Sequence, residues 1–170
     1  VLNATSGTTL TGGVSIDSID TNDQSIAFSA LKLNAKVGTY KLRFTVELAG
    51  QPVDGKFVDS DNLTLTAGAA AQLKVVTDAA GAKVGYSFST QPKIAILDAD
   101  GNAIASTDAF DHASVGVTIS NSHSHVATWL GNNSMAAVNG VADFANLSNG
   151  LSAANGLGFS GSADTYDLTF

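Results

Sequence analysis

The chain has no cysteine among its 170 residues and is poor in charge, with eight Lys and Arg against fifteen Asp and Glu. The lack of thiols excludes disulfides, iron–sulfur clusters, cysteine-based zinc sites and thiol catalysis. The few cations do not cluster, and the formal net charge is −7. Because phosphate backbones and anionic lipids are bound by clustered Lys and Arg, we expect neither nucleic acid nor an anionic membrane surface as a partner.

Long apolar runs and a basic leader segment are also missing. No stretch reaches the ~18 consecutive apolar residues that a membrane-spanning helix needs, so we expect no membrane insertion. No basic segment followed by an apolar one opens the sequence, so we expect any export signal to have been removed already or to lie outside this segment. Aromatic residues make up 7%, with a single Trp, which is few for a carbohydrate-binding platform.

Apolar and polar residues alternate with a period of two, which predicts half-buried β-strands. The alternating segments are 41–48, 62–66, 72–75, 93–97, 115–120 and 166–170. Turn signals such as Ala49-Gly50 and Asn139-Gly140 separate them, and no segment predicts an amphipathic helix. Short strands joined by turns are typical of an all-β, antiparallel β-sandwich.

The end of the sequence repeats its beginning. The matching segments are 9–12 with 128–131, 25–31 with 140–147, and 38–44 with 163–170. The copies lie 119 residues apart at their glycines, 116 at their phenylalanines and 126 at their tyrosines. This pattern predicts modules of similar strand order that differ by loop insertions. The small-residue segment 66–71 is the expected joint between them.

A succession of blocks carries a resemblance to a known family. The blocks are an Ala/Gly joint at 67–71, a strand with Gln91-Pro92, the turn Asp98-Ala-Asp100-Gly101-Asn102, a closing strand at 138–147 and a tyrosine strand at 164–170. Together they resemble the bacterial Ig-like tandem repeats of large cell-surface proteins, namely S-layer proteins and adhesin stalks. The resemblance covers residues 67–170 well and residues 8–66 in part.

The resemblance implies antiparallel Ig-like β-sandwich units in tandem, one of them incomplete within this chain. Residues 1–66 would form the closing part of one unit. Residues 67–170 would form a second unit that lacks its last strand. That strand would come from chain outside this segment or from strand donation by a neighbouring copy. Tyr40 and Tyr166, each near the start of a late strand, are expected to return their hydroxyls to the backbone, as in Ig sandwiches.

The function implied is that of a structural and assembly segment of a secreted bacterial surface protein, located outside the cell at its surface. Its partners would be neighbouring copies or units of the same surface protein, and we expect it not to be an enzyme. Two alternatives stay open. One is a carbohydrate- or protein-binding module, and the other is an accessory Ig-like domain of an extracellular enzyme.

Calcium is the cofactor that the acidic residues suggest. Asp98, Asp100 and Asn102 place oxygen-bearing side chains around one turn, and Asp59 and Asp61 lie near the expected joint. Carboxylate and amide oxygens are the ligands that Ca²⁺ prefers. The alternative is a turn that uses Asp and Asn for local backbone hydrogen bonds, with solvated acidic loops elsewhere. Asp54 and a further acidic cluster at 17–23 belong to the same hypothesis.

The histidines are the remaining candidates. On a strand, His123 and His125 would face the same side and could share a transition metal, with Asp111 and His112 as further ligands. The alternative is an exposed polar loop. None of the three histidines lies beside a nucleophile motif, so the sequence does not support a Ser-His-Asp triad.

Overall fold

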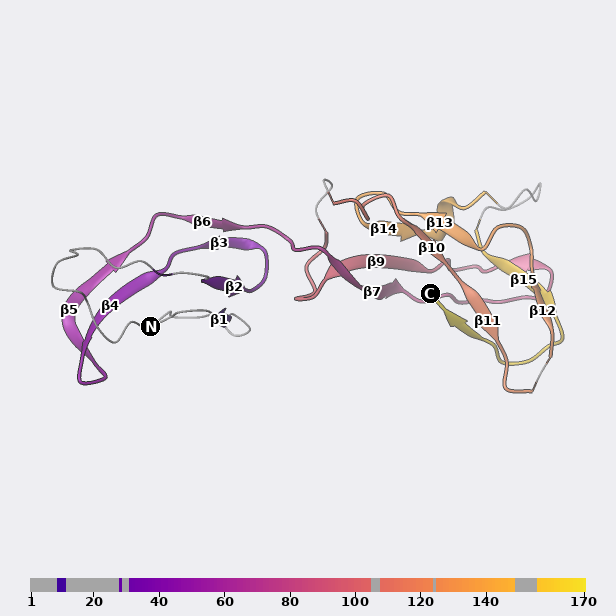
Figure 1. Cartoon of the computed structure of the whole chain (residues 1–170). Coiled ribbons are helices and arrows are strands. Elements are labelled where there is room, and N and C mark those ends of the chain that lie inside the picture. Colours follow the sequence, from indigo (N-terminus) through magenta and orange to yellow (C-terminus); the bar gives the residue numbers. More distant parts are fainter. Residues whose placement is uncertain (1–8, 12–27, 29–30, 105–107, 124, 149–155) are drawn as a thin grey trace. The chain divides into compact units, whose positions relative to one another are not determined.

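The computed structural model describes residues 9–11, 28, 31–104, 108–123, 125–148 and 156–170 (Figure 1). In this part of the chain every strand pair is antiparallel, and the one helical element is a single 3-10 turn. The predicted all-β, antiparallel class is therefore confirmed. None of the described helical residues forms a segment that could cross a membrane. The chain divides into two compact units, Val1–Ala67 (unit 1) and Gly68–Phe170 (unit 2).

The described residues of unit 1 form three antiparallel strand pairs. They are β1 (Thr9–Thr11) with β2 (Lys32–Asn34), β3 (Gly38–Tyr40) with β6 (Leu63–Leu65), and β4 (Arg43–Leu48) with β5 (Gln51–Asp59). The β4–β5 hairpin turns at Ala49 and Gly50, whose φ angles are 51° and 74°. Positive φ at both positions is the geometry of a two-residue type I′ turn. The predicted turn signal at 49–50 is thus confirmed.

Within the part of unit 2 that the structure describes, ten strands form four antiparallel sheets. The sheets are β14 (Val141–Asp143) with β9 (Lys93–Asp98) and β7 (Ala70–Thr77); β12 (Ala127–Trp129) with β15 (Gly158–Gly161) and β8 (Tyr86–Ser87); β10 (Ser114–Gly116) with β13 (Ser134–Ala136); and β11 (Thr118–Ser120) with β16 (Asp167–Thr169). The 3-10 turn η1 (Phe144–Asn146) follows β14. The strands expected at 72–75, 93–97 and 166–170 are present with boundaries shifted by one or two residues.

The core of unit 2 forms around β9, which is hydrogen-bonded on both sides. Ile94 and Ile96 are 0% and 5% exposed, as expected for an apolar central strand. The other buried members of the core are Phe88, Ile104, Val115, Val117, Ala137, Ala142, Phe144, Leu147, Leu157 and Phe159. Burial of one large aliphatic side chain stabilises a fold by roughly 1.5–3 kcal/mol, so this cluster is the main source of stability of the unit.

Two predicted strands are interrupted. The segment 115–120 is not one strand, because the chain changes partner at Val117: β10 pairs with β13, whereas β11 pairs with β16. Val117 is 1% exposed, and hydrogen bonds with Asn133 hold its backbone N–H and C=O (2.9 and 2.8 Å). The closing strand at 138–147 ends at Asp143, whose carboxylate accepts from the N–H of Ala145 (3.2 Å) and starts η1.

The Asn139-Gly140 turn signal is confirmed. Asn139 and Gly140 have φ angles of 51° and 69°, and they join residues that pair across the turn, Val138 and Val141. A Cβ atom at position 140 would lie 2.7 Å from Cγ1 of the buried Ile104. Glycine is therefore required there both by the backbone conformation and by the packing of the core.

Candidate functional site

Asp98, the first calcium candidate, lies at the end of β9 and is 4% exposed. Its Oδ1 accepts hydrogen bonds from the backbone N–H groups of Asp100 (3.0 Å) and Asn102 (2.8 Å). Its Oδ2 accepts from the N–H of Gly68 (2.9 Å) and from Nδ2 of Asn102 (2.9 Å). Burial favours the neutral acid, but the bonds from Asn102, Gly68 and Asp100 outweigh burial and hold the pKa of Asp98 below its ordinary value.

These contacts have the form of the alternative that the sequence left open, a turn built on local hydrogen bonds. Four donors already point at the two oxygens of Asp98, so a cation there would have to displace them. The carboxylate also joins the start of unit 2, at Gly68, to the end of β9. Asp98 and Asn102 therefore fix this turn, and calcium binding by Asp98, Asp100 and Asn102 stays a prediction.

The second group of calcium candidates lies in unit 1. Arg43 donates two hydrogen bonds to Asp59, from Nε to Oδ1 (2.6 Å) and from Nη2 to Oδ2 (2.8 Å). This guanidinium holds the pKa of Asp59 below its ordinary value. Asp61 follows Ser60, whose hydroxyl donates to the Asp61 carbonyl (2.7 Å). Asp59 thus forms an ion pair that joins β5 to β4. The acidic cluster at 17–23 lies outside the described residues.

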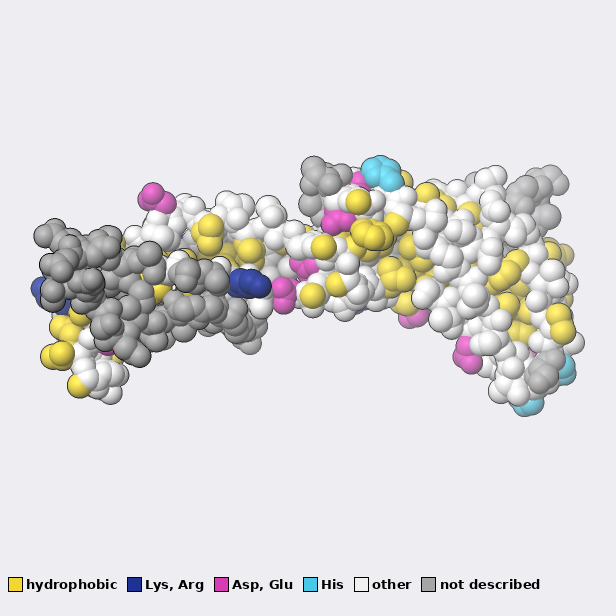
Figure 2. All heavy atoms as spheres, viewed as in Figure 1, with side chains coloured by type: hydrophobic (Ala, Val, Ile, Leu, Met, Phe, Trp, Pro, Cys, Tyr) yellow, Lys and Arg dark blue, Asp and Glu magenta, His cyan; other side chains and the backbone are white. Residues whose placement is uncertain are grey.

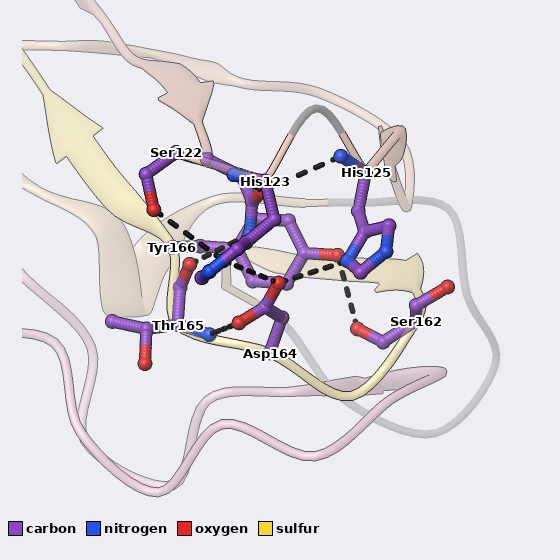
Figure 3. A network of polar contacts seen from close by, with 8 residues as sticks. Ser122, His123, His125, Ser162, Asp164, Thr165 and Tyr166 are labelled. Carbon is purple, nitrogen blue, oxygen red and sulfur yellow. Dashed lines mark hydrogen bonds and ion pairs between the residues drawn. The ribbon is translucent and has the colours of Figure 1, made fainter.

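His123 and His125 meet at Asp164, a residue that the sequence reading did not single out. Nδ1 of His123 and Nδ1 of His125 lie 3.2 and 2.8 Å from the same oxygen, Oδ2 of Asp164 (Figure 3). The Asn121 side chain accepts from the N–H groups of both histidines and donates to the Thr165 carbonyl (2.8 Å). The loop after β11 is thereby tied to the loop before β16.

The hydrogen bonds at Asp164 favour its ionised form. The Asn121 amide contributes most, followed by the Thr165 N–H and by His125, and together they lower the pKa of Asp164 to about 2. The carboxylate stays ionised at neutral pH, so each imidazole that donates to it carries its proton on Nδ1. This leaves Nε2 of both rings as the nitrogen that faces away from the aspartate.

The cluster is not a catalytic triad. Ser122 Oγ lies 3.4 Å from Nδ1 of His123, the same ring nitrogen that faces Asp164. A triad needs the serine and the carboxylate on opposite ring nitrogens, because the proton must leave on one side while the other side is held. Within the described part of the chain, no group of three or more His, Asp or Glu side chains is arranged to hold a metal ion.

Asp111 and His112 form a pair of their own. Nδ1 of His112 lies 2.9 Å from Oδ2 of Asp111, which is 1% exposed, whereas the side chain of His112 is 76% exposed. Neither carboxylate oxygen of Asp111 makes a hydrogen bond within the described residues. The structure does not bring this pair to His123 and His125, so the predicted four-residue metal site is not assembled in the described residues.

The two tyrosines make the same hydrogen bond. Tyr40 Oη donates to the carbonyl of Lys36 (2.5 Å), and Tyr166 Oη donates to the carbonyl of Ser162 (3.0 Å). In each case the acceptor lies four residues upstream. The expectation that these hydroxyls return to the backbone is confirmed. In unit 1 this bond spans β3, whose last residue is Tyr40, and in unit 2 it constrains the chain just before β16.

Strand pairs in the two units also share a register. The corresponding pairs are Thr9↔Asn34 with Thr128↔Ser160, and Leu10↔Leu33 with Trp129↔Phe159. The first members lie 119 residues apart and the second members 126, which are the spacings of the matching glycines and tyrosines. An aromatic contact is shared as well: Phe28 with Phe44 in unit 1 (centroids 5.2 Å apart) and Phe144 with Phe170 in unit 2 (5.8 Å).

A groove of about 420 Å³ runs beside β16 in unit 2. Its apolar lining includes Val75 of β7 and the half-buried Tyr166, Leu168 and Phe170, and the acidic side chains include Asp78 and Asp167. Exposed hydrophobic side chains are visible over unit 2 in the space-filling view (Figure 2). No sequence signal pointed to this groove, because its two walls come from opposite ends of the unit.

No family model matches the chain, and no curated protein or solved structure is significantly similar to it. The geometry of the chain itself is therefore the basis for a functional proposal.

Proposed function

We propose that the chain is a non-catalytic structural and assembly segment of a secreted bacterial surface protein, built from Ig-like β-sandwich units in tandem. The observation that carries the proposal is the shared register of β1–β2 and β12–β15 at the spacings found in the sequence. Two unrelated folds would have no reason to repeat a register, a tyrosine hydrogen bond and an aromatic contact in the same order.

The tyrosine bonds support the Ig-like part of the proposal. A tyrosine whose hydroxyl returns to the backbone a few residues upstream, near the start of a late strand, is a feature of Ig sandwiches. Tyr40 and Tyr166 both have this arrangement. An array of such units suits a mechanical role, because each unit has its own core and adjoining units meet at a short joint.

The chemistry of the described side chains fits a role without catalysis. The His123–Asp164–His125 cluster holds two loops together, and Ser122 shares its nitrogen with the carboxylate. Asp98 is used as a hydrogen-bond acceptor inside a turn. These contacts stabilise the loops that connect strands.

Location at the cell surface is tested on the source bacterium. An antibody against this chain should label intact cells, and brief proteolysis of intact cells should remove the label. Labelling that needs permeabilised cells would overturn the surface location. The matched control is a cytosolic protein of the same cells, which must stay unlabelled until the cells are opened.

The tandem arrangement is tested by stretching the whole chain in a single-molecule force experiment. Two compact units should unfold in two separate events. Unit 2 has 103 residues, so its event should release roughly 340–370 Å of chain before its folded length is subtracted. A single event for the whole chain would show one cooperative domain and would contradict the tandem part of the proposal.

A further inference from the structure

Unit 2 contains two buried aspartates whose surroundings differ sharply. Asp98 is 4% exposed and Asp111 is 1% exposed. The carboxylate of Asp98 accepts four hydrogen bonds, whereas neither oxygen of Asp111 has a hydrogen-bond partner in the described residues. Buried polar groups in folded proteins nearly always have such a partner, and a bound ion is one physical reason for an exception. Asp98 is therefore a structural acceptor, and Asp111 needs a different explanation.

The backbone holds Asp111 in its buried position. Its N–H donates to the carbonyl of Asp108 (3.1 Å), and its carbonyl accepts from the N–H of Gly140 (3.2 Å). Two residues later, the carbonyl of Ala113 accepts from the N–H of Ala137 (2.8 Å). The turn that carries Asp111 is thus joined on both sides to the chain around Gly140. Its carboxylate cannot reach solvent without breaking these bonds.

His112 brings a second polar atom to the carboxylate. Its Nδ1 lies 2.9 Å from Oδ2 of Asp111, yet no hydrogen bond joins the two atoms. Two ligand atoms that bind one metal ion at about 2.0–2.2 Å lie about 2.8–3.6 Å apart at octahedral or tetrahedral angles. The observed separation fits two ligands of one ion. The side chain of His112 is 76% exposed, so an ion could reach the site from its side.

The sequence offers little permanent positive charge to balance this carboxylate. No Lys or Arg follows Lys93 in the chain, and Lys93 itself forms an ion pair with Asp143 (2.8 Å). The turn adds a further carboxylate, Asp108, whose Oδ1 accepts from the N–H of Phe110 (2.8 Å). A buried charge is tolerated when it is paired or coordinates a metal. A bound cation would supply the missing compensation.

We propose that Asp111 and His112 bind one divalent transition-metal ion, with Oδ2 and Nδ1 as the ligands. Water completes the coordination sphere on the exposed side of His112. The mixed nitrogen and oxygen donors select an ion of the Zn²⁺ type, because Ca²⁺ and Mg²⁺ take oxygen ligands. The site uses two side chains, so it differs from the groups of three or more that were sought in the described residues. It goes beyond the proposed assembly role and does not rest on it.

The test is thermal unfolding of the full chain, first stripped of metal with EDTA and then titrated with ZnCl₂ in chelator-free buffer. An ion that binds the folded chain raises its melting temperature as the ion concentration rises. Above the dissociation constant, each tenfold increase in free Zn²⁺ should raise the melting temperature of unit 2 by roughly 5 °C or more. CaCl₂ at the same concentrations should give no such rise.

The histidines supply matched variants. His112→Ala should abolish the Zn²⁺-dependent rise. His125→Ala should keep it, although both histidines contact an aspartate through Nδ1 and both are exposed. This pair of variants separates binding at Asp111 from binding at the histidines near Asp164.

Asp111→Asn separates a metal ligand from a structural acceptor. This variant keeps the size of the side chain and removes its charge. It should abolish the response to Zn²⁺ and raise the melting temperature of the metal-free chain, because a buried charge without hydrogen bonds is lost. Asp98→Asn is the control with the opposite expectation, since it should lower the melting temperature and keep the response to Zn²⁺.

Four results would overturn the proposal. They are no rise in melting temperature with Zn²⁺, a rise that persists in Asp111→Asn, a rise that is lost in His125→Ala but kept in His112→Ala, and a fall in the melting temperature of metal-free Asp111→Asn. Surface labelling and the number of unfolding events are measured without added Zn²⁺. A failure here is therefore separable from a failure of the proposed function.

Discussion

Replacing Asp98 should destabilise unit 2 more than any other single loss of a carboxylate in the described residues. The side chain is 4% exposed and accepts four hydrogen bonds, three of them from backbone N–H groups. Backbone donors cannot rotate away to find water, so Asp98→Ala would leave them buried and unpaired. Asp98→Asn has the same size and isolates the effect of charge and acceptor number.

The magnitude follows from those contacts. A hydrogen bond to a charged group contributes about 1.5–3 kcal/mol, and a buried donor without a partner costs about 1–3 kcal/mol. The four losses will not add in full, because water can enter the space that the side chain leaves. We expect Asp98→Ala to lower the free energy of unfolding by about 3–5 kcal/mol. Asp98→Asn keeps one acceptor oxygen and turns an NH₂ group toward two donors, which should cost about 2–3 kcal/mol.

The pH dependence gives a second readout. The folded-state pKa of Asp98 is lower than its ordinary value of about 3.9. A group of this kind contributes stability that is present above the unfolded pKa and is lost as pH falls through the folded pKa. The difference in unfolding free energy between the parent chain and Asp98→Asn should therefore be constant above about pH 5 and shrink below about pH 4.

The assay is urea unfolding of the full chain followed by tryptophan fluorescence. Trp129 is the single Trp of the sequence and lies in β12, so the signal reports on unit 2 alone. Asp78→Asn, at an exposed position, is the control and should change stability by no more than about 0.5 kcal/mol. The reasoning is refuted if Asp98→Ala lowers the free energy of unfolding by less than about 1 kcal/mol. It is also refuted if the difference in unfolding free energy between the parent chain and Asp98→Asn does not shrink in acid.

Thermal unfolding of the parent chain and of Asp98→Asn tests calcium binding. Calcium binding at Asp98, Asp100 and Asn102 predicts a lower melting temperature in EDTA than in millimolar Ca²⁺. Full hydrogen bonding of the Asp98 carboxylate predicts the same melting temperature in both. A calcium-dependent increase that disappears in Asp98→Asn would show that the cation displaces the backbone donors.

Three further predictions concern single side chains. Ala49→Asn should stabilise unit 1 by about 0.5–1 kcal/mol, because Asn tolerates the left-handed conformation of this turn better than Ala; an unchanged calorimetric transition would contradict this. Tyr166→Phe should cost about 1 kcal/mol by removing the bond to the Ser162 carbonyl; fluorescence-detected unfolding indistinguishable from the parent would contradict it. Asn121→Ala should raise the pKa of Asp164 from about 2 toward its ordinary value, and by more than His125→Ala does, since the Asn121 amide contributes most to the shift. Carboxyl titration by NMR measures this pKa, and a larger effect of His125→Ala would reverse the ranking.

The strands and turns could be predicted from the sequence because their signals are local. Alternation predicts the strands at 93–97 and 41–48. Ile94 and Ile96 are buried as the pattern expects, but Ala95 is buried as well, and Val46 and Leu48 are 58% and 75% exposed, so the pattern gives the strand and not always its buried face. The Asn139-Gly140 signal reports on two φ angles and nothing else. These features depend on neighbouring residues, so one sequence is enough to read them.

Interruptions of strands could not be predicted in this way. Val117 continues the alternation of 115–120, yet the chain changes sheets there because Asn133, from a different loop, holds both backbone groups of that residue. The turn after Asp143 is similar, since Asp143 and Phe144 fit a strand pattern as well as a 3-10 turn. Tertiary hydrogen bonds and the burial of Phe144 decide the outcome.

The candidate sites show the same difference between local signals and contacts that depend on the fold. His123 and His125 were recognisable as a pair because they are two residues apart. Asp164, which both of them contact, comes from a distant loop and carries no motif. The groove beside β16 likewise has one wall from β7 and one from the last strand. Sites made of segments far apart in sequence need the fold before they can be seen.

The correspondence between the units explains how spacing can vary while structure is kept. A slip of one residue in strand pairing would turn every side chain of that strand to the opposite face. Trp129 and Phe159 pack edge to face in unit 2, so their register cannot slip without exposing an aromatic pair. In the proposed tandem arrangement, insertions would be accommodated in the loops between the strands, so the matching residues can lie 119, 116 and 126 apart.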